Sequence, residues 1–241
     1  MSDAVTATRS GQVRDLVRSA HPKQAVFLTV VIGVLAAVDG RAQREVLVSA
    51  AAVLAVQLSL GLSNDLCDQR HDYRAQTPGK PVASGALPAS RASYWMTVLV
   101  LLAVPLSMYS GTAAGLALIA TLPIGWVHNR WLHRTGFSFL GWSLTCALLP
   151  AFLAYGGWGK GVHGDPPTYA VTGAAAAVGF CLHFVTTLGD LVDDNKSGAR
   201  NLPLRMALRM GAPKLLVLTI LMTTVAVAGL AVASLTIGLR Q

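Results

Sequence analysis

Three acids follow an uncharged run at residues 46–63 in the stretch Asn64-Asp65-Leu66-Cys67-Asp68-Gln69-Arg70-His71-Asp72, and this stretch decides the architecture. On a helix, Asn64, Asp68 and Asp72 recur every four residues and therefore lie along one face. Acids beside a membrane segment are costly and indicate a functional site. Carboxylates that share a helix face repel one another, so the arrangement is stable only if a cation sits between them.

The rest of the sequence is that of a membrane protein, with 53% hydrophobic and only 12% charged residues among 241. A soluble domain carries about twice that charged fraction. A bilayer span needs about 20 apolar residues, and the long uncharged runs are residues 46–63, 92–127, 135–159, 166–189 and 215–239. The run 92–127 is long enough for two helices with a turn at Ser110-Gly111, and residues 24–38 form a shorter first span. We therefore predict an all-α, polytopic membrane bundle of about seven transmembrane helices.

The domain organisation follows from the position of the first span. Residues 1–20 are polar, with Arg9, Arg14 and Arg18, and we expect them to be a flexible cytoplasmic leader. Residues 21–241 are expected to form a single transmembrane domain.

The 19 Lys and Arg residues are distributed unevenly over the segments between the expected spans. Fifteen lie in the N-terminal segment and in segments 64–91, 128–135 and 190–214, and the alternating segments hold only four. Cytoplasmic segments of membrane proteins carry an excess of Lys and Arg. We therefore expect a multi-pass protein of the cell membrane whose N-terminus and acid-bearing segments face the cytoplasm. The net charge of +8 then reflects topology, so the expected partner is the lipid bilayer and not nucleic acid.

A second acidic group, Asp190, Asp193 and Asp194, follows the run at residues 166–189. The two groups hold six of the eleven Asp and Glu residues, which favours a site over a solvated loop of mixed charge. The cation that fits is Mg²⁺, which takes oxygen ligands and typically binds one or two carboxylates together with substrate phosphates. Basic residues follow each group, as binding of a diphosphate requires: Arg70, Arg74 and Lys80, then Lys196, Arg200 and Arg205.

These motifs resemble those of the UbiA superfamily of intramembrane prenyltransferases. The first stretch is similar to the NDxxDxxxD motif of that family, and the resemblance extends in order over nearly the whole chain. The further matching segments are Lys80-Pro81 with Ser84-Gly85, similar to "RP…SG"; Asn129-Arg130-Trp131-Leu132-His133-Arg134-Thr135, similar to "N…LKRT"; and Asp190-Leu191-Val192-Asp193-Asp194, similar to the second, DxxxD-type motif.

The resemblance implies a helical bundle around a central cavity that is capped by both acidic motifs. It implies Mg²⁺ as cofactor, a prenyl diphosphate as substrate, and an acceptor that attacks the ionised prenyl group. The expected catalytic residues are Asp68, Asp72, Asp190 and Asp194, and the expected metal ligands are these four with Asp193. The expected substrate-binding residues are Asn64, Arg74, Lys80, Arg130, Arg134 and Gln57.

The sequence departs from the family pattern at three points. Family members usually have about nine spans, so seven would leave the second half of the bundle incomplete. A homo-oligomer, a degenerate bundle or a reduced activity could follow. Members that prenylate 4-hydroxybenzoate carry an arginine seven residues before the Asn of the motif, where this chain has Gln57. His133 stands where the third segment usually has Lys. The acceptor is therefore expected to be small and not a benzoate.

Two other functions are compatible with the same motifs. A terpene cyclase on this scaffold would use the same ionisation, but double bonds of the prenyl tail would capture the cation, and no polar acceptor pocket would be needed. A non-catalytic membrane subunit is suggested only by the small number of spans, and retention of both acidic groups argues against it.

Overall fold

The computed structural model describes residues 9–157 and 164–240, and these residues are almost entirely helical. The helices of the bundle are α2 (Pro22–Val38), α3 (Gln43–Ala75), α5 (Ala89–Met108), α6 (Thr112–Ile119), α7 (Thr121–Arg130), α8 (Phe139–Tyr155), α9 (Tyr169–Thr187) and α12 (Ala212–Thr236). Shorter helices connect them: α1 (Arg9–Ser19), α4 (Pro81–Ser84), the 3-10 turn Leu132–Arg134, α10 (Leu191–Lys196) and α11 (Leu202–Met210).

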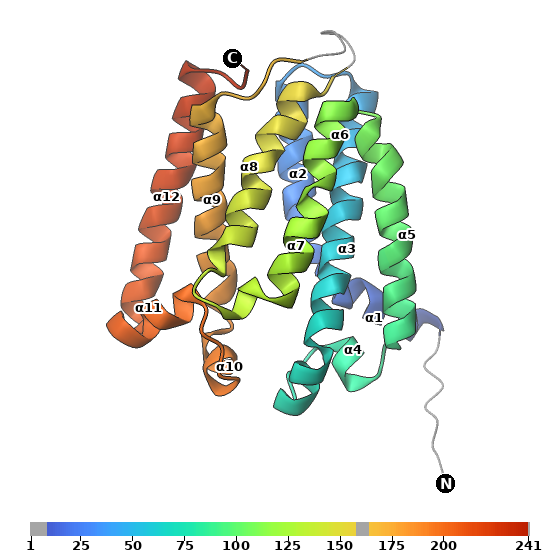
Figure 1. Cartoon of the computed structure of the whole chain (residues 1–241), viewed down its shortest axis with the longest axis vertical. Coiled ribbons are helices and arrows are strands. Elements are labelled where there is room, and N and C mark those ends of the chain that lie inside the picture. The colour runs from blue at the N-terminus through green and yellow to red at the C-terminus, as the bar shows by residue number, and fades with distance from the viewer. Residues whose placement is uncertain (1–8, 158–163, 241) are drawn as a thin grey trace.

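The long helices run side by side, and the short ones α1, α4, α10 and α11 gather at one end of the bundle, at the bottom of Figure 1. In one half, α3 packs against α2, α5 and α7; in the other, α8 packs against α9, and α9 against α12. Helices α6 and α7 follow one another along the same wall and contact α8. Both acidic groups lie at the end that carries the short helices.

The polytopic helical fold is confirmed, but the count of seven spans is not. Within the described residues, four helices, α3, α5, α9 and α12, are long and apolar enough to cross a membrane, and the bent pair Gly11–Ser19 and Pro22–Val38 would make a fifth. Helix α8 is apolar but shorter, at 17 residues. The turn expected at Ser110-Gly111 does separate α5 from α6.

The first acidic stretch lies on a helix and not in a loop, because α3 continues through it to Ala75. This continuous helix of 33 residues carries Asn64, Asp68 and Asp72 on consecutive turns. A rigid helix therefore sets the spacing of these side chains, and no loop closure is needed to bring them together.

The leader differs from the expected flexible segment, because residues Arg9–Ser19 form α1; residues 1–8 lie outside the described part. The chain bends by 62° between this helix and α2, and His21 takes a left-handed conformation (φ 51°) just before Pro22. The bend brings the backbone of Ala20 against Gly61 of α3, where a Cβ would lie 2.3 Å from the Ala20 carbonyl oxygen. The close approach depends on glycine at position 61 and places His21 beside the acidic stretch.

The opposite end of the bundle is closed by the residues after α12. The Arg240 guanidinium donates two hydrogen bonds of 2.7 Å to the Asp39 carboxylate in the α2–α3 connection. The Thr168 amide donates to the Leu239 carbonyl at 3.0 Å, and the Leu239 side chain packs on the apolar core. Residues far apart in sequence are thereby joined where the two halves of the bundle meet.

We predict that Arg240→Ala lowers the stability of the protein, because it removes both charge-assisted bonds and leaves Asp39 with one cation fewer. Hydrogen bonds to charged groups are worth about 1.5–3 kcal/mol, and about 1 kcal/mol shifts the melting temperature of a chain of this size by roughly 2–4 °C. Thermal unfolding in detergent measures the effect. Arg209→Ala, which removes an exposed arginine of α11, is the control, and equal melting temperatures of the two variants would contradict the prediction.

Candidate active site

A cavity of about 400 Å³ opens at the end of the bundle that carries both acidic groups. Helices α2, α3, α7, α8 and α9 form its walls, and α10 contributes to its rim. On α3 the lining runs from Ala75 down to Gln57, about 27 Å along a helix axis. Beyond Gln57 the bundle is filled by an apolar core that includes Val53 and Phe152. The cavity is therefore acidic at its mouth and is closed by apolar side chains below.

The Asp68 carboxylate is held by residues from two parts of the chain. Asn64 Nδ2 donates to Asp68 Oδ2 at 3.3 Å across one helical turn. On the other side, Arg134 Nη2 donates to Asp68 Oδ1 at 3.0 Å, and His133 Nε2 lies 3.3 Å from the same oxygen. The 3-10 turn after α7 thus places both side chains over α3. His133, the residue that departs from the family pattern, contributes to this contact.

Asp65 and Asp72 lie on either side of Lys80, which follows α3 by a short connection. Lys80 Nζ donates to Asp65 Oδ1 at 2.8 Å and lies 3.8 Å from Asp72 Oδ2. Asp65 is buried and is also in contact with His21 Nε2 at 3.2 Å. Burial opposes the charge on Lys80, but Asp65, Asp72 and Asp68 outweigh it and raise the pKa of the ammonium. Asp65 does not line the cavity; it fixes the lysine that does.

The second acidic group surrounds the start of α10. Asp190 immediately precedes this helix, and Asp193 and Asp194 lie in its first turn; all three line the cavity. Asn201 Nδ2 donates to Asp194 Oδ2 at 2.6 Å, which ties α10 to the start of α11. Burial, together with the nearby charge of Asp190, raises the pKa of the Asp194 carboxyl.

The cavity carries an excess of negative charge. Among the described residues that line it, five are aspartates and two are fixed cations, Lys80 and Arg134. Asp72 Oδ2 is buried and has no hydrogen-bond partner within residues 9–157 and 164–240. Over the same residues, no three His, Cys, Asp or Glu side chains converge on one point. Mg²⁺ does not require such convergence, because it usually keeps several waters and binds one or two carboxylates plus phosphate oxygens. The donor set therefore fits Mg²⁺.

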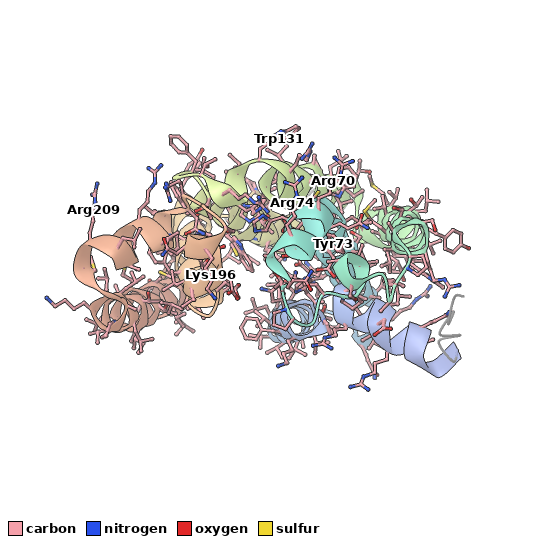
Figure 2. All side chains as sticks on the ribbon, turned by 90° about the horizontal axis from the view of Figure 1, so that it is seen from below. Arg70, Tyr73, Arg74, Trp131, Lys196 and Arg209 are labelled. Atoms are coloured by element: carbon pink, nitrogen blue, oxygen red, sulfur yellow. The ribbon has the colours of Figure 1, made fainter. Side chains whose placement is uncertain are left out.

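Two residues expected to bind substrate, Arg74 and Arg130, lie outside this cavity. Arg74 is exposed at the tip of α3, near Arg70 and Tyr73 in Figure 2, which views the bundle from its acidic end. Arg130 is exposed at the end of α7. Arg74 comes two positions after the lining residue Asp72, and Arg130 comes one position after the lining residue Asn129. A helix turns by about 100° per residue. The side chains of Arg74 and Arg130 therefore project from other faces of their helices than the face that lines the cavity.

The deeper wall combines apolar residues, such as Leu60 and Trp142, with polar ones, and it contains no fixed charge among its described residues. Gln57 lines the cavity as expected, about 10 Å below Asn64 on α3. From the sequence, His183 was weighed as a base or a buried histidine bonded to a neighbouring helix, with the second favoured, and no role was given to His71 or His128. All five histidines of the described residues line the cavity: His21, His71, His128, His133 and His183. His183, which could be either a base or a buried structural residue, is buried and bonds to Ser138 at 2.7 Å. Clustering of a rare residue type is the signal that could have indicated this wall.

Comparison with known proteins identifies the fold and the family. The family model described as the UbiA prenyltransferase family matches residues 26–240. A UbiA homolog from Archaeoglobus fulgidus bound to GPP and Mg²⁺ superposes with a TM-score of 0.71 at 15% identity, over 92% of this chain and 78% of that one. The same homolog bound to DMAPP and Mg²⁺ gives 0.70 at 17% identity, over 92% and 78%.

A structure of digeranylgeranylglyceryl phosphate synthase is also similar, with a TM-score of 0.63 at 17% identity over 94% of this chain and 79% of that one. A search of curated proteins finds no match. At these identities the structures show the fold alone, whereas the family model covers most of the sequence. With two acidic groups at the mouth of one helical cavity, the chain belongs to the UbiA prenyltransferase family.

Proposed function

We propose that this protein is a Mg²⁺-dependent intramembrane prenyltransferase that ionises a prenyl diphosphate and transfers the prenyl group to a small, neutral acceptor. One observation carries the proposal: five aspartates from two distant segments line one cavity that holds only two fixed cations among its described residues. Such an excess of negative charge is stable only when cations enter. A diphosphate brings further negative charge, so the ion must bridge protein and substrate.

The proposed metal ligands are the acids at the mouth: Asp68 and Asp72 from α3, and Asp190, Asp193 and Asp194 from the second group. Bound there, Mg²⁺ would act as a Lewis acid on the phosphate oxygens. Asn64 orients Asp68 through its hydrogen bond across one turn. The solved homolog that was captured with GPP and Mg²⁺ supports this ligand class.

Lys80 and Arg134 are the proposed diphosphate-binding cations. Each is held by a carboxylate, Lys80 by Asp65 and Arg134 by Asp68, so their positions are set before substrate arrives. When the bond between C1 and the diphosphate oxygen breaks, the electron pair leaves with the diphosphate. Fixed cations stabilise that developing charge without reorganisation. Arg74 and Arg130 are left out of this set because they lie outside the cavity.

Transfer to an acceptor is favoured over cyclisation by the character of the deeper wall. A cyclase needs apolar surroundings for the tail, whereas polar residues, Gln57, His128 and Thr145 among them, line this cavity together with apolar ones. The reaction product separates the two functions. A prenylated co-substrate supports the transferase, and a cyclic hydrocarbon or alcohol formed without any co-substrate supports the cyclase.

We predict that Asp68→Asn and Asp190→Asn each reduce Mg²⁺-dependent diphosphate release on the order of 100-fold or more, since each removes one negative ligand where charge must be stabilised. The assay follows release from geranyl diphosphate by purified protein in detergent. Asp15→Asn on α1, distant in sequence from both groups and outside the cavity lining, is the matched control. Near-normal release by either variant would remove that residue from the site.

We further predict that Gln57→Arg improves binding of 4-hydroxybenzoate relative to a neutral phenol of similar size. An amide cannot neutralise a carboxylate, and leaving a buried charge unpaired costs several kcal/mol. The measurement is a side-by-side determination of KM for both acceptors with each protein. Efficient prenylation of 4-hydroxybenzoate by the wild type would contradict the prediction, and would point to one of the lining cations, Lys80 or Arg134, as the partner of its carboxylate.

A further inference from the structure

The histidines of the deep wall differ in how far their hydrogen bonds are already satisfied. His133 contacts Asp68 and the His128 carbonyl. His183 Nε2 forms a hydrogen bond with Ser138 Oγ, and this oxygen also accepts a hydrogen bond of 3.1 Å from the Leu202 amide. His128 is different: its Nδ1 is buried and has no hydrogen-bond partner within residues 9–157 and 164–240. The ring lines the cavity. Because Nδ1 is enclosed against Gly141 of α8, a ligand in the cavity would approach the ring at Nε2.

The surrounding structure holds the His128 ring in one position. The His183 ring packs against it edge to face, with centroids 6.2 Å apart and an interplanar angle of 87°. The His133 ring lies 6.2 Å away on another side. Since His183 is anchored by Ser138 and His133 by Asp68, both neighbours of His128 are fixed.

A glycine in α8 makes room for the same ring. Gly141 is buried inside this helix, where alanine would normally be preferred. A Cβ at this position would lie 2.6 Å from Cβ, Cγ and Nδ1 of His128, which is closer than real contacts allow. Gly141 leaves space at the point where α7 places the His128 imidazole against α8. The position of the ring therefore depends on this glycine.

The chemistry of this wall suits a neutral ligand with a hydroxyl group. Among described lining residues the fixed cations are Lys80 and Arg134, and both are already paired with aspartates near the mouth. Gln57 adds an amide that can donate and accept hydrogen bonds. Burial lowers the pKa of His128 to about 3, so this imidazole is neutral before the reaction and has a nitrogen lone pair that can accept a hydrogen bond or a proton.

We propose that His128 binds the hydroxyl group of the acceptor and accepts its proton, with Gln57 on the same cavity wall as a second hydrogen-bonding group; this rests on the proposed prenyltransferase function. The bond between prenyl C1 and the diphosphate oxygen breaks, and the diphosphate leaves with the electron pair. The acceptor forms a new bond to C1 from its oxygen, or from a ring carbon if it is a phenol. The proton that the acceptor loses passes to the His128 imidazole and then to solvent.

The test uses the full-length protein in detergent with Mg²⁺, geranyl diphosphate and 1-naphthol as a neutral phenolic probe. His128→Phe keeps an aromatic ring of similar size but removes both nitrogens. Gly141→Ala displaces the ring while leaving its chemistry intact. Trp126→Phe, which changes an exposed residue on the same helix outside the cavity lining, is the control. Diphosphate release and prenylated naphthol are measured separately, and KM is determined for each substrate.

We expect His128→Phe to lower formation of prenylated naphthol on the order of 100-fold, the typical contribution of a general base. The KM for geranyl diphosphate should change less than about threefold, and geraniol should increase as water captures the prenyl group. Gly141→Ala should shift the product ratio in the same direction, and Trp126→Phe should not. Unchanged prenylation by His128→Phe, or consumption of geranyl diphosphate by the wild type without prenylation of naphthol, would overturn the inference. Failure of the wild type to bind or consume geranyl diphosphate would instead refute the proposed function.

Discussion

Repulsion among carboxylates at the mouth of the cavity is the constraint on which the structure depends. Asp68 and Asp72 arrive on α3, and Asp190, Asp193 and Asp194 arrive more than a hundred residues later, around α10. All of them line one cavity that has two fixed cations among its described residues. Such an arrangement would be destabilising without further cations, so its presence is best explained by a ligand that supplies them.

Several contacts hold the acids and their cations in place against this repulsion. Glycine at position 61 lets the backbone of Ala20 approach α3 closely, which puts His21 beside Asp65. Asp65 in turn fixes Lys80 near Asp72. On the opposite wall Arg134 and Asn201 each hold one carboxylate, Asp68 and Asp194 respectively. The mouth is thus built from residues of every quarter of the chain, which explains why short motifs are spread over the whole sequence.

The sequence predicted the parts of the site that follow from helical periodicity. Asn64, Asp68 and Asp72 were expected on one face because they recur every four residues, and they all line the cavity. The same periodicity would have excluded Arg74, two residues beyond Asp72, if α3 had been expected to continue to Ala75. Because residues 64–91 were expected only as a segment between two spans, the end of α3 at Ala75 was not anticipated. The membrane fold followed from composition, although the length and composition of the described helices support four or five spans and do not confirm seven.

Other features could not be predicted because they depend on contacts between distant segments. The role of Asp65 follows from the bend at His21 and from the connection that returns Lys80 to α3. The importance of His128 depends on α7 packing against a glycine of α8, which no local pattern reveals. The closure of the far end by Arg240 likewise requires Asp39, two hundred and one residues earlier.

The central claim is that the two acidic groups bind a prenyl diphosphate through Mg²⁺. The most direct measurement is isothermal titration of the purified protein with geranyl S-thiolodiphosphate, an analogue that ionises poorly, once with Mg²⁺ and once with EDTA. The account predicts binding with Mg²⁺ and an affinity on the order of 100-fold weaker with EDTA, about 2.7 kcal/mol. Equal affinity under both conditions, or no binding under either, would contradict it.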